Sequence, residues 1–355
     1  MNHLRLTRRA AGLVLLNMGV ALARTPVHPR VDAQQLDRFR DHVEQTEPRI
    51  RGVVVLRDGQ TVFEYYRKGL DASSPHHGAS VTKSVMSMLV AIAIQRGEIE
   101  GVDETLSQLL EEARGGGIDA RVQAMRLKDL LTMATGFAPT TSDPALDYRE
   151  FHQRLEAGNV AKNALTRTIA QRPGSTFHYS NLDAHLVSLA LTRRTGQSAL
   201  AYARAHLFAP MGLDANQVTW STSSQGVSNG ASELYMPTGH LARLGQLTLQ
   251  QGAWQGRQVL SRAYLADATR PHLSAPSSGT LGPLGYGYLF WTTPGYQQDL
   301  PAWFAAGHGG QLIYVIKERD TVIAINSESM DSEHRSGAQR TAKVMRDLLL
   351  PAILP

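Results

Sequence analysis

The stretch Ser80-Val81-Thr82-Lys83 opens an apolar run that predicts a buried helix from Ser84 to Arg96, with Gly97 as its stop. The apolar side chains of this run recur at helical spacing, at Val85, Met88, Leu89 and Ile92. Ser80 therefore lies in the first turn, and Lys83 follows one turn later on the same face. Burial disfavours a charged amine, so the pKa of Lys83 should fall from about 10.4 toward about 7–8, where it can take a serine proton at neutral pH.

This short pattern also has an ordinary explanation. A serine three residues before a lysine is expected by chance about once in a chain of this length. Lys83 is nevertheless the only lysine of the chain that is preceded in this way. On local context alone, catalysis and coincidence are equally open, and other motifs are needed to decide between them.

The composition is that of an ordinary globular enzyme. The chain has 355 residues, 42% hydrophobic and 19% charged, which is enough for one large domain or two intimate ones. Much of the positive charge is arginine, scattered without a long basic run, and the net charge is +5. We therefore expect no nucleic-acid partner. Cysteine is absent, so the fold depends on its core and not on disulfides.

Residues 1–23 have the features of an export signal. Arg5, Arg8 and Arg9 form a basic start, the apolar stretch 10–22 is too short to span a bilayer, and residues 21–23 fit cleavage beside small residues. The arginine pair is compatible with the twin-arginine route, and ordinary secretion is equally compatible. A single membrane anchor is the less favoured alternative. We expect a mature chain over 24–355 that is periplasmic or secreted and not bound to a membrane after cleavage.

The rest of the chain predicts an α+β fold. A helix over 31–47 precedes two β-rich runs around Asp58-Gly59, which together predict a β-hairpin. Three further strands are expected late in the chain, over 303–306, 311–317 and 321–326. A last helix is expected over 336–349, ending at Pro351.

The simplest assembly of these elements is one antiparallel sheet of about five strands, built from both chain ends and flanked by helices. A mostly helical lobe is inserted between the two halves of the sheet. We assign 31–97 and 281–355 to the sheet part and 98–280 to the lobe, within a single domain.

A second candidate motif, Tyr179-Ser180-Asn181, follows a Pro-Gly and polar stretch that predicts a loop leading into a helix. A phenol beside a cationic group can give and receive a proton, and an asparagine amide can orient both Lys83 and a substrate carbonyl. The alternative is a buried tyrosine next to a helix-capping asparagine. That alternative would be favoured if the motif stood alone.

The third candidate is Gly307-His308-Gly309-Gly310-Gln311, which opens a late strand. Glycines at a strand start allow another backbone or a ligand to come close, although a tight turn is a common alternative. In the functional interpretation, this strand runs beside the nucleophile. The backbone N–H groups of Gln311 and Ser80 would then hold an oxyanion, and each donor would stabilise the transition state by about 3–4 kcal/mol.

In this order and spacing, the three motifs resemble those of the serine β-lactamase superfamily. The resemblance is to its branch of class C β-lactamases, D-aminopeptidases, DD-carboxypeptidases, esterases and 6-aminohexanoate-dimer hydrolases, and it covers roughly residues 48–348. Residues 229–236 look most like the 6-aminohexanoate-dimer hydrolases. The implied fold is that of the β-lactamases and transpeptidases.

The resemblance implies a role for each motif residue. Ser80 is the nucleophile, Lys83 is its base or the base's partner, and Tyr179 relays protons to the leaving group. His308 stands where true lactamases have a lysine, and this departure weakens a β-lactamase assignment because a neutral imidazole lacks the fixed charge. The expected substrate-binding residues are Asn181, His308, Gly309, Gly310, Gln311 and, as a lid residue, Tyr148.

Two other patterns are weaker. Residues 226–230 match the Gly-x-Ser-x-Gly elbow of α/β-hydrolases, but that elbow needs an apolar strand before it and a helix after it, and the sequence indicates neither. The chain has no metal-ligand motif, so neither a metal nor another cofactor is expected. His240 is expected to be a surface cap.

The favoured function is a serine hydrolase that forms an acyl-enzyme with a small-molecule amide or ester. The alternatives are β-lactamase or DD-peptidase activity, and a non-hydrolysing penicillin-binding or sensor module on the same fold. The shape of the pocket depends on residues 137–165 and 215–240, whose conformation the sequence leaves open. The substrate is open for this reason, and the oligomeric state is also open.

Overall fold

An eight-stranded antiparallel sheet forms the centre of the computed structural model, which describes residues 31–138, 151–153, 155, 160–277, 280–296, 300–328 and 334–354. The strands lie in the order β2-β1-β13-β12-β11-β10-β9-β8. Their bounds are β1 Ile50–Arg57, β2 Gln60–Tyr66, β8 Leu273–Ala275, β9 Leu284–Tyr286, β10 Trp291–Tyr296, β11 Leu300–Ala306, β12 Leu312–Ile316 and β13 Thr321–Ser327.

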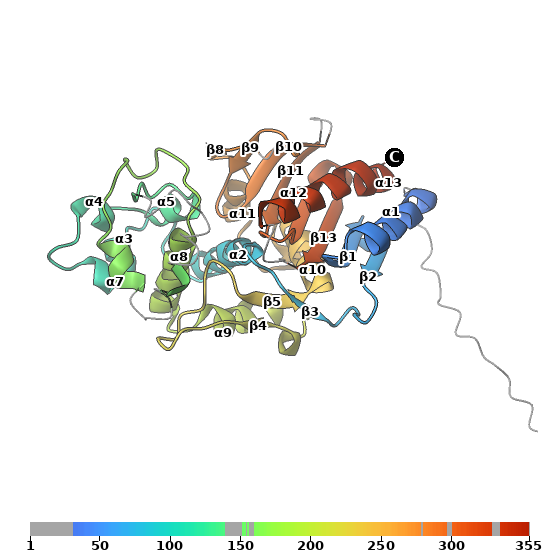
Figure 1. Cartoon of the computed structure of the whole chain (residues 1–355). Coiled ribbons are helices and arrows are strands. Elements are labelled where there is room, and N and C mark those ends of the chain that lie inside the picture. Colours follow the sequence, from blue (N-terminus) through green and yellow to red (C-terminus); the bar gives the residue numbers. More distant parts are fainter. Residues whose placement is uncertain are drawn as a thin grey trace, which may run out of the picture.

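The predicted hairpin is present at the start of this sheet. β1 and β2 are joined at Asp58 and Gly59, whose φ angles of 50° and 74° are the left-handed values that a two-residue hairpin turn needs. Along its other edge β1 pairs with β13, over its whole length. An early strand and a late strand of the chain therefore lie side by side in the sheet (Figure 1), as the sequence predicts.

The prediction of about five strands is too low. β8, β9 and β10 extend the sheet beyond β11, and β8 and β9 have three residues each. Such short runs, interrupted by glycine and proline, show no readable alternation, and they become strands because a neighbouring strand pairs with them. β8 also lies within 98–280, where the sequence predicts only the lobe.

Helices cover both faces of the sheet. One face packs against α1 (Ala33–Thr46) and the C-terminal elements, which are α12 (His334–Val344), a π-helical segment (Met345–Leu349) and α13 (Leu350–Ile353). Pro351 lies in the first turn of α13, where its missing N–H is tolerated, so it does not end the last helix as predicted. The other face packs against α2 (Val81–Gln95) and α10 (Thr238–Leu249).

α10 approaches the sheet closely at Gly245. A Cβ atom there would lie 2.5 Å from a methyl group of Val322 and 2.7 Å from one of Ile313, so only glycine fits. α10 therefore packs on the sheet, although it falls within 98–280. It also carries His240, which is 7% exposed and whose pKa is lowered by burial, so the prediction of a surface cap is wrong.

The rest of the described chain combines helices with two small sheets, β3-β5-β4 and β6-β7, of which only β3 precedes α2. Its helices are α3 Leu106–Leu109, α4 Ala120–Gln123, α5 Leu127–Leu131, α7 Val160–Leu165, α8 Asn181–Thr195, α9 Ala199–Ala203, a π-helical segment Arg204–Phe208 and α11 Arg262–Ala268. Its strands are β3 Pro75–His77, β4 Thr219–Trp220, β5 Leu234–Pro237, β6 Ala253–Trp254 and β7 Arg257–Gln258. Short 3-10 turns span Glu111–Ala113, Ala215–Gln217 and Lys317–Arg319.

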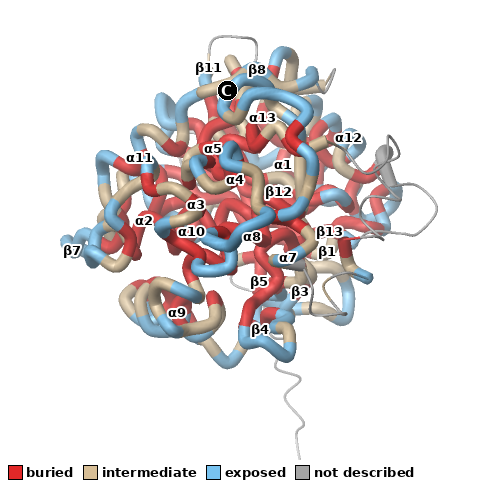
Figure 2. The backbone as a smooth tube through the Cα atoms, turned by 90° about the vertical axis from the view of Figure 1, so that its left-hand side faces the viewer, coloured by how far each residue is buried: buried red, intermediate tan, exposed pale blue. Residues whose placement is uncertain are grey.

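α2 runs through the interior of the molecule, between the sheet and α8 (Figures 1 and 2). Every residue of α2 from Val81 to Ala93 is buried. The first turn of this helix, which carries the candidate nucleophile, is therefore held rigidly by packing on all sides.

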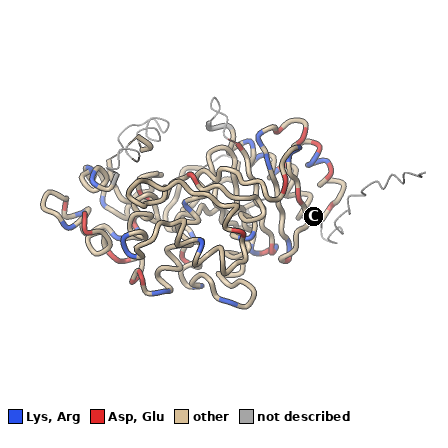
Figure 3. Tube along the Cα trace, turned by 90° about the horizontal axis from the view of Figure 1, so that it is seen from below, with Lys and Arg blue, Asp and Glu red and all other residues tan. Residues whose placement is uncertain are grey.

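Charged residues of both signs are interspersed along the described trace (Figure 3). Some of them pair across elements, such as Arg193 with Glu112 at 2.7 Å. Within the described residues, none of the helices combines the length and the apolar character needed to cross a membrane.

Candidate active site

The Ser80 hydroxyl and the Lys83 amine meet at the first turn of α2. Lys83 Nζ donates to Ser80 Oγ at 2.9 Å, and the Lys83 backbone N–H donates to the Ser80 carbonyl at 3.1 Å. This is the geometry that a separation of three residues on one helix predicts. Ser80 itself is the N-cap of α2, where the first backbone N–H groups of a helix point outward.

Two residues distant in sequence complete the surroundings of the amine. Lys83 Nζ also donates to Asn181 Oδ1 and to the Ala231 carbonyl, both at 2.8 Å. The side chain is 1% exposed, and desolvation lowers its pKa to about 7. The amine is therefore held by three acceptors and is partly free of its proton at neutral pH.

Tyr179 lies against the same pair. Lys83 Nζ is 4.9 Å from the centroid of the Tyr179 ring, and a hydrogen bond joins the Tyr179 hydroxyl to the Ser80 side chain. Burial raises the pKa of the phenol to about 12, although the bond to Ser80 opposes this. The phenol therefore keeps its proton at neutral pH and can donate it.

The junction between the Tyr179 loop and α8 has a local cause. Ser180 is the N-cap of α8, and its hydroxyl accepts from the Asp183 backbone N–H at 3.1 Å and donates to Asp183 Oδ1 at 2.8 Å. Asn181 is the first residue of the helix, so its side chain is available to Lys83. A loop leading into a helix is predicted here, and the cap is Ser180 in place of Asn181.

The glycine-rich motif forms the turn between β11 and β12, next to the chain that leads into Ser80. A Cβ atom on Gly307 would lie 2.9 Å from the Gly78 carbonyl, so glycine permits this close approach. The Gln311 side chain accepts from Gly309 N–H at 3.0 Å and donates to the Ser327 carbonyl at 2.8 Å, which locks the turn. Gly309, Gly310 and Gln311 are buried and His308 is exposed.

One part of the site escaped the sequence analysis. The Ala231 carbonyl, which accepts from Lys83, belongs to a tight turn in which Asn229 Oδ1 accepts from the backbone N–H groups of Ala231 and Ser232 at 3.0 and 3.2 Å. A Cβ atom on Gly230 would lie 2.3 Å from the Ala184 carbonyl, so this turn packs directly on α8. The Asn-Gly pair was a turn signal, but nothing local connects it to Lys83.

Two predicted features are not part of this arrangement. Tyr148, the expected lid residue, lies outside the described residues. The Gly-x-Ser-x-Gly match at 226–230 is followed by β5 and not by a helix, and Ser228 is fully buried, so it does not form a nucleophile elbow.

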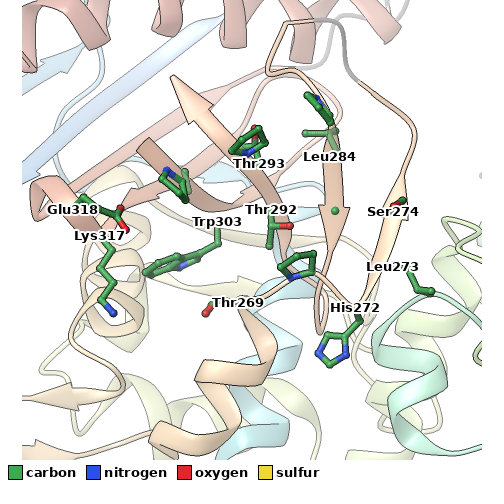
Figure 4. A pocket seen from close by; sticks show the side chains of 16 residues that line it. Thr269, His272, Leu273, Ser274, Leu284, Thr292, Thr293, Trp303, Lys317 and Glu318 are labelled. Atoms are coloured by element: carbon green, nitrogen blue, oxygen red, sulfur yellow. The ribbon is translucent and has the colours of Figure 1, made fainter. Parts of the chain in front are cut away.

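A hollow of about 630 Å³ lies elsewhere, over β8 to β11 (Figure 4). His272, Thr292 and Trp303 are among its lining residues. None of the lining residues comes from the three motifs, so this hollow is separate from the site at Ser80.

Comparison with known proteins agrees with the arrangement of the motifs. The sequence profile of the family described as Beta-lactamase matches residues 37–346. The chain belongs to the Beta-lactamase family. It is similar to the 6-aminohexanoate-dimer hydrolase of Paenarthrobacter ureafaciens, with 23% identity over 346 residues that cover 92% of this chain and 86% of that protein.

Solved structures are similar in fold. A homologue of penicillin-binding proteins from Pyrococcus abyssi, described as octameric, matches with a TM-score of 0.67 and 17% identity, over 90% of this chain and 78% of that one. A D-stereospecific amidohydrolase from Streptomyces sp. matches with a TM-score of 0.65 and 16% identity, over 87% of this chain and 97% of that one. The predicted family and its α+β, β-lactamase and transpeptidase-like fold are confirmed, and the family is one of hydrolases.

Proposed function

We propose that the chain is a serine hydrolase that cleaves small amides or esters through an acyl-enzyme on Ser80. The observation that carries this proposal is the buried Lys83 amine, 2.9 Å from the Ser80 hydroxyl. Because its pKa is lowered to about 7, about half of this amine is free at neutral pH to accept the hydroxyl proton.

Acylation begins when the Ser80 oxygen bonds to the substrate carbonyl carbon and its proton passes to Lys83. The Tyr179 hydroxyl then gives its proton to the leaving amine or alcohol as the bond to that group breaks. The Lys83 ammonium beside the phenol replaces the proton that Tyr179 has lost. Water next attacks the acyl-enzyme, one of its protons restores the Ser80 hydroxyl, and the free acid leaves.

Lys83 is assigned as the base and Tyr179 as the acid. The pKa of the phenol is raised to about 12 by burial, whereas that of the amine is lowered to about 7. At neutral pH about half of the amine therefore lacks its proton, whereas the phenol holds its own. Asn181 orients the amine through its 2.8 Å hydrogen bond.

The oxyanion of the tetrahedral intermediate is assigned to the backbone N–H groups of Ser80 and Gln311. The first lies at the N-terminus of α2, and the second lies in the turn whose Gly307 packs against Gly78. Each such donor contributes about 3–4 kcal/mol in the transition state. The glycines of the third motif permit this approach of the two backbones.

An amide or ester is favoured over a β-lactam as the substrate. His308 takes the place of the lysine of true lactamases, and its side chain is exposed. Two similar proteins are named as a 6-aminohexanoate-dimer hydrolase and an amidohydrolase, which supports an amide. The substrate is the only partner that we propose.

The test is Ser80→Ala, assayed on p-nitrophenyl esters, an amide library and nitrocefin. We expect a loss of at least about 10³-fold in kcat on the substrates that the wild type cleaves. Ser87→Ala is the matched control, because Ser87 is buried on the same helix and its hydroxyl is hydrogen-bonded to that of Tyr264, at 3.0 Å. Activity that survives Ser80→Ala would refute the proposal. A penicillin or fluorophosphonate adduct on Ser80 without any turnover would identify a binding module instead.

We also propose export to the periplasm or the medium, on the basis of the signal-like residues 1–23. N-terminal sequencing of the protein recovered from those fractions should begin near residue 24. Recovery only from the cytoplasm with residues 1–23 intact would refute this.

A further inference from the structure

The Tyr179 ring lies in an aromatic cluster whose other members belong to none of the three motifs. Trp291 of β10 stacks on it, with the ring centroids 5.7 Å apart and the planes 20° apart. Tyr286 of β9 meets the same ring edge-on, at 6.5 Å and 86°. Phe177 contacts both Trp291 and Tyr286, at 5.8 and 4.9 Å.

Trp291 links this cluster to the central sheet. Its indole stacks on Phe304 of β11 at 6.2 Å and 14°, and Phe304 stacks on Tyr314 of β12 at 5.8 Å and 30°. A row of rings therefore runs from Tyr179 into the sheet interior. Each aromatic contact contributes about 0.5–1.5 kcal/mol beyond the area that it buries.

The backbone around Tyr179 is tied on both sides, but this does not set the direction of the side chain. Tyr179 lies in the loop before α8, outside any helix or strand. On one side of it the His178 N–H donates to the Met133 carbonyl at 2.8 Å, and on the other the Ser180 N–H donates to the Met133 sulfur at 3.3 Å. The direction of the phenol is thus set by what packs on its ring. A misplacement of about 1 Å at a reacting group can cost about 10²-fold in rate.

We infer that Trp291 is a positioning residue for Tyr179, which fixes the phenol beside Ser80 and Lys83 and keeps water from its ring. This inference rests on the proposed function. The shielding agrees with the burial that raises the pKa of Tyr179 to about 12. Trp291 is itself half-buried, and its role is exerted through the phenol and not on the substrate.

The test compares Trp291→Ala, Trp291→Leu and Trp291→Phe. The first two should lower kcat by about 10–100-fold with KM changed less than about threefold, and Phe should recover most of the loss because a flat ring can stack again. Leu keeps an apolar side chain in place if the Ala variant does not fold. Trp303→Phe is the control: Trp303 lies on the neighbouring strand, pairs with Thr292 and donates to Thr248 Oγ1 at 3.0 Å. It should leave kcat unchanged.

A second readout does not depend on activity. The tyrosinate absorbance of each protein, minus that of its Tyr179→Phe counterpart, follows this phenol alone. In Trp291→Ala or Trp291→Leu its pKa should move from about 12 toward the ordinary 10, while Trp291→Phe and Trp303→Phe should stay near the wild type.

The possible outcomes separate the two proposals. An unchanged kcat and an unchanged Tyr179 titration in Trp291→Leu would overturn the inference. So would a raised KM with kcat and titration unchanged, because Trp291 would then contact the substrate directly. Activity that survives Ser80→Ala would overturn the proposed function alone, since the titration of Tyr179 would still report on the packing of Trp291 against its ring.

Discussion

Replacing Lys83 by Met should remove a pH dependence from the stability of the protein. The amine is 1% exposed, and desolvation lowers its pKa from 10.5 to about 7 in the folded chain. Between these two values the unfolded chain holds a proton on Lys83 that the folded chain has released. The free energy of unfolding of the wild type therefore rises with pH across this window, and Met removes that contribution.

The size of the effect follows from the two pKa values. The difference between the two pKa values corresponds to about 5 kcal/mol over the whole window, of which about 2–3 kcal/mol falls between about pH 6.5 and about pH 9. Met also leaves Asn181 Oδ1 and the Ala231 carbonyl without their donor, and each loss lowers the stability by about 1–3 kcal/mol. These two acceptors do not titrate, so their loss lowers the free energy of unfolding by the same amount at every pH and leaves its slope against pH unchanged. The slope is therefore the quantity to measure.

The assay is urea unfolding at several pH values between about 6.5 and about 9. The stability of the wild type minus that of Lys83→Met should rise by about 2–3 kcal/mol across this range. Lys343→Met is the control, because Lys343 is 66% exposed and its removal should leave the slope unchanged. A difference for Lys83→Met that stays constant within about 0.5 kcal/mol would mean that the amine titrates alike in both states, and the neutral-lysine mechanism would fail.

Three further predictions concern activity. The acid limb of kcat/KM in the wild type should have its midpoint at about 7, because protonated Lys83 cannot accept the serine proton; a limb below about 5 would contradict this. Asn181→Ala removes an acceptor that favours the protonated amine, so this limb should move to lower pH and kcat should fall about tenfold, whereas an upward move would contradict the reasoning. Gly307→Ala places a Cβ atom 2.9 Å from the Gly78 carbonyl, and should cost about 1–3 kcal/mol in urea unfolding together with most of the activity.

The sequence by itself determined the features that depend on neighbours along the chain. Ser80 and Lys83 are three residues apart on one helix, so helical geometry alone brings their side chains together. The hairpin at Asp58-Gly59 needs only two residues with positive φ between β-rich runs. The order of the three motifs was enough to predict the family, and with it the fold.

Only the tertiary structure decided which distant groups surround the amine and the phenol. Lys83 meets Asn181 and the Ala231 carbonyl across 98 and 148 positions of the sequence. Trp291 reaches Tyr179 from a strand that belongs to a part of the sheet the sequence did not predict. The physical reason is that such contacts, and the burial that lowers the pKa of Lys83, arise when whole elements pack together, and no local pattern of residues records which elements will meet.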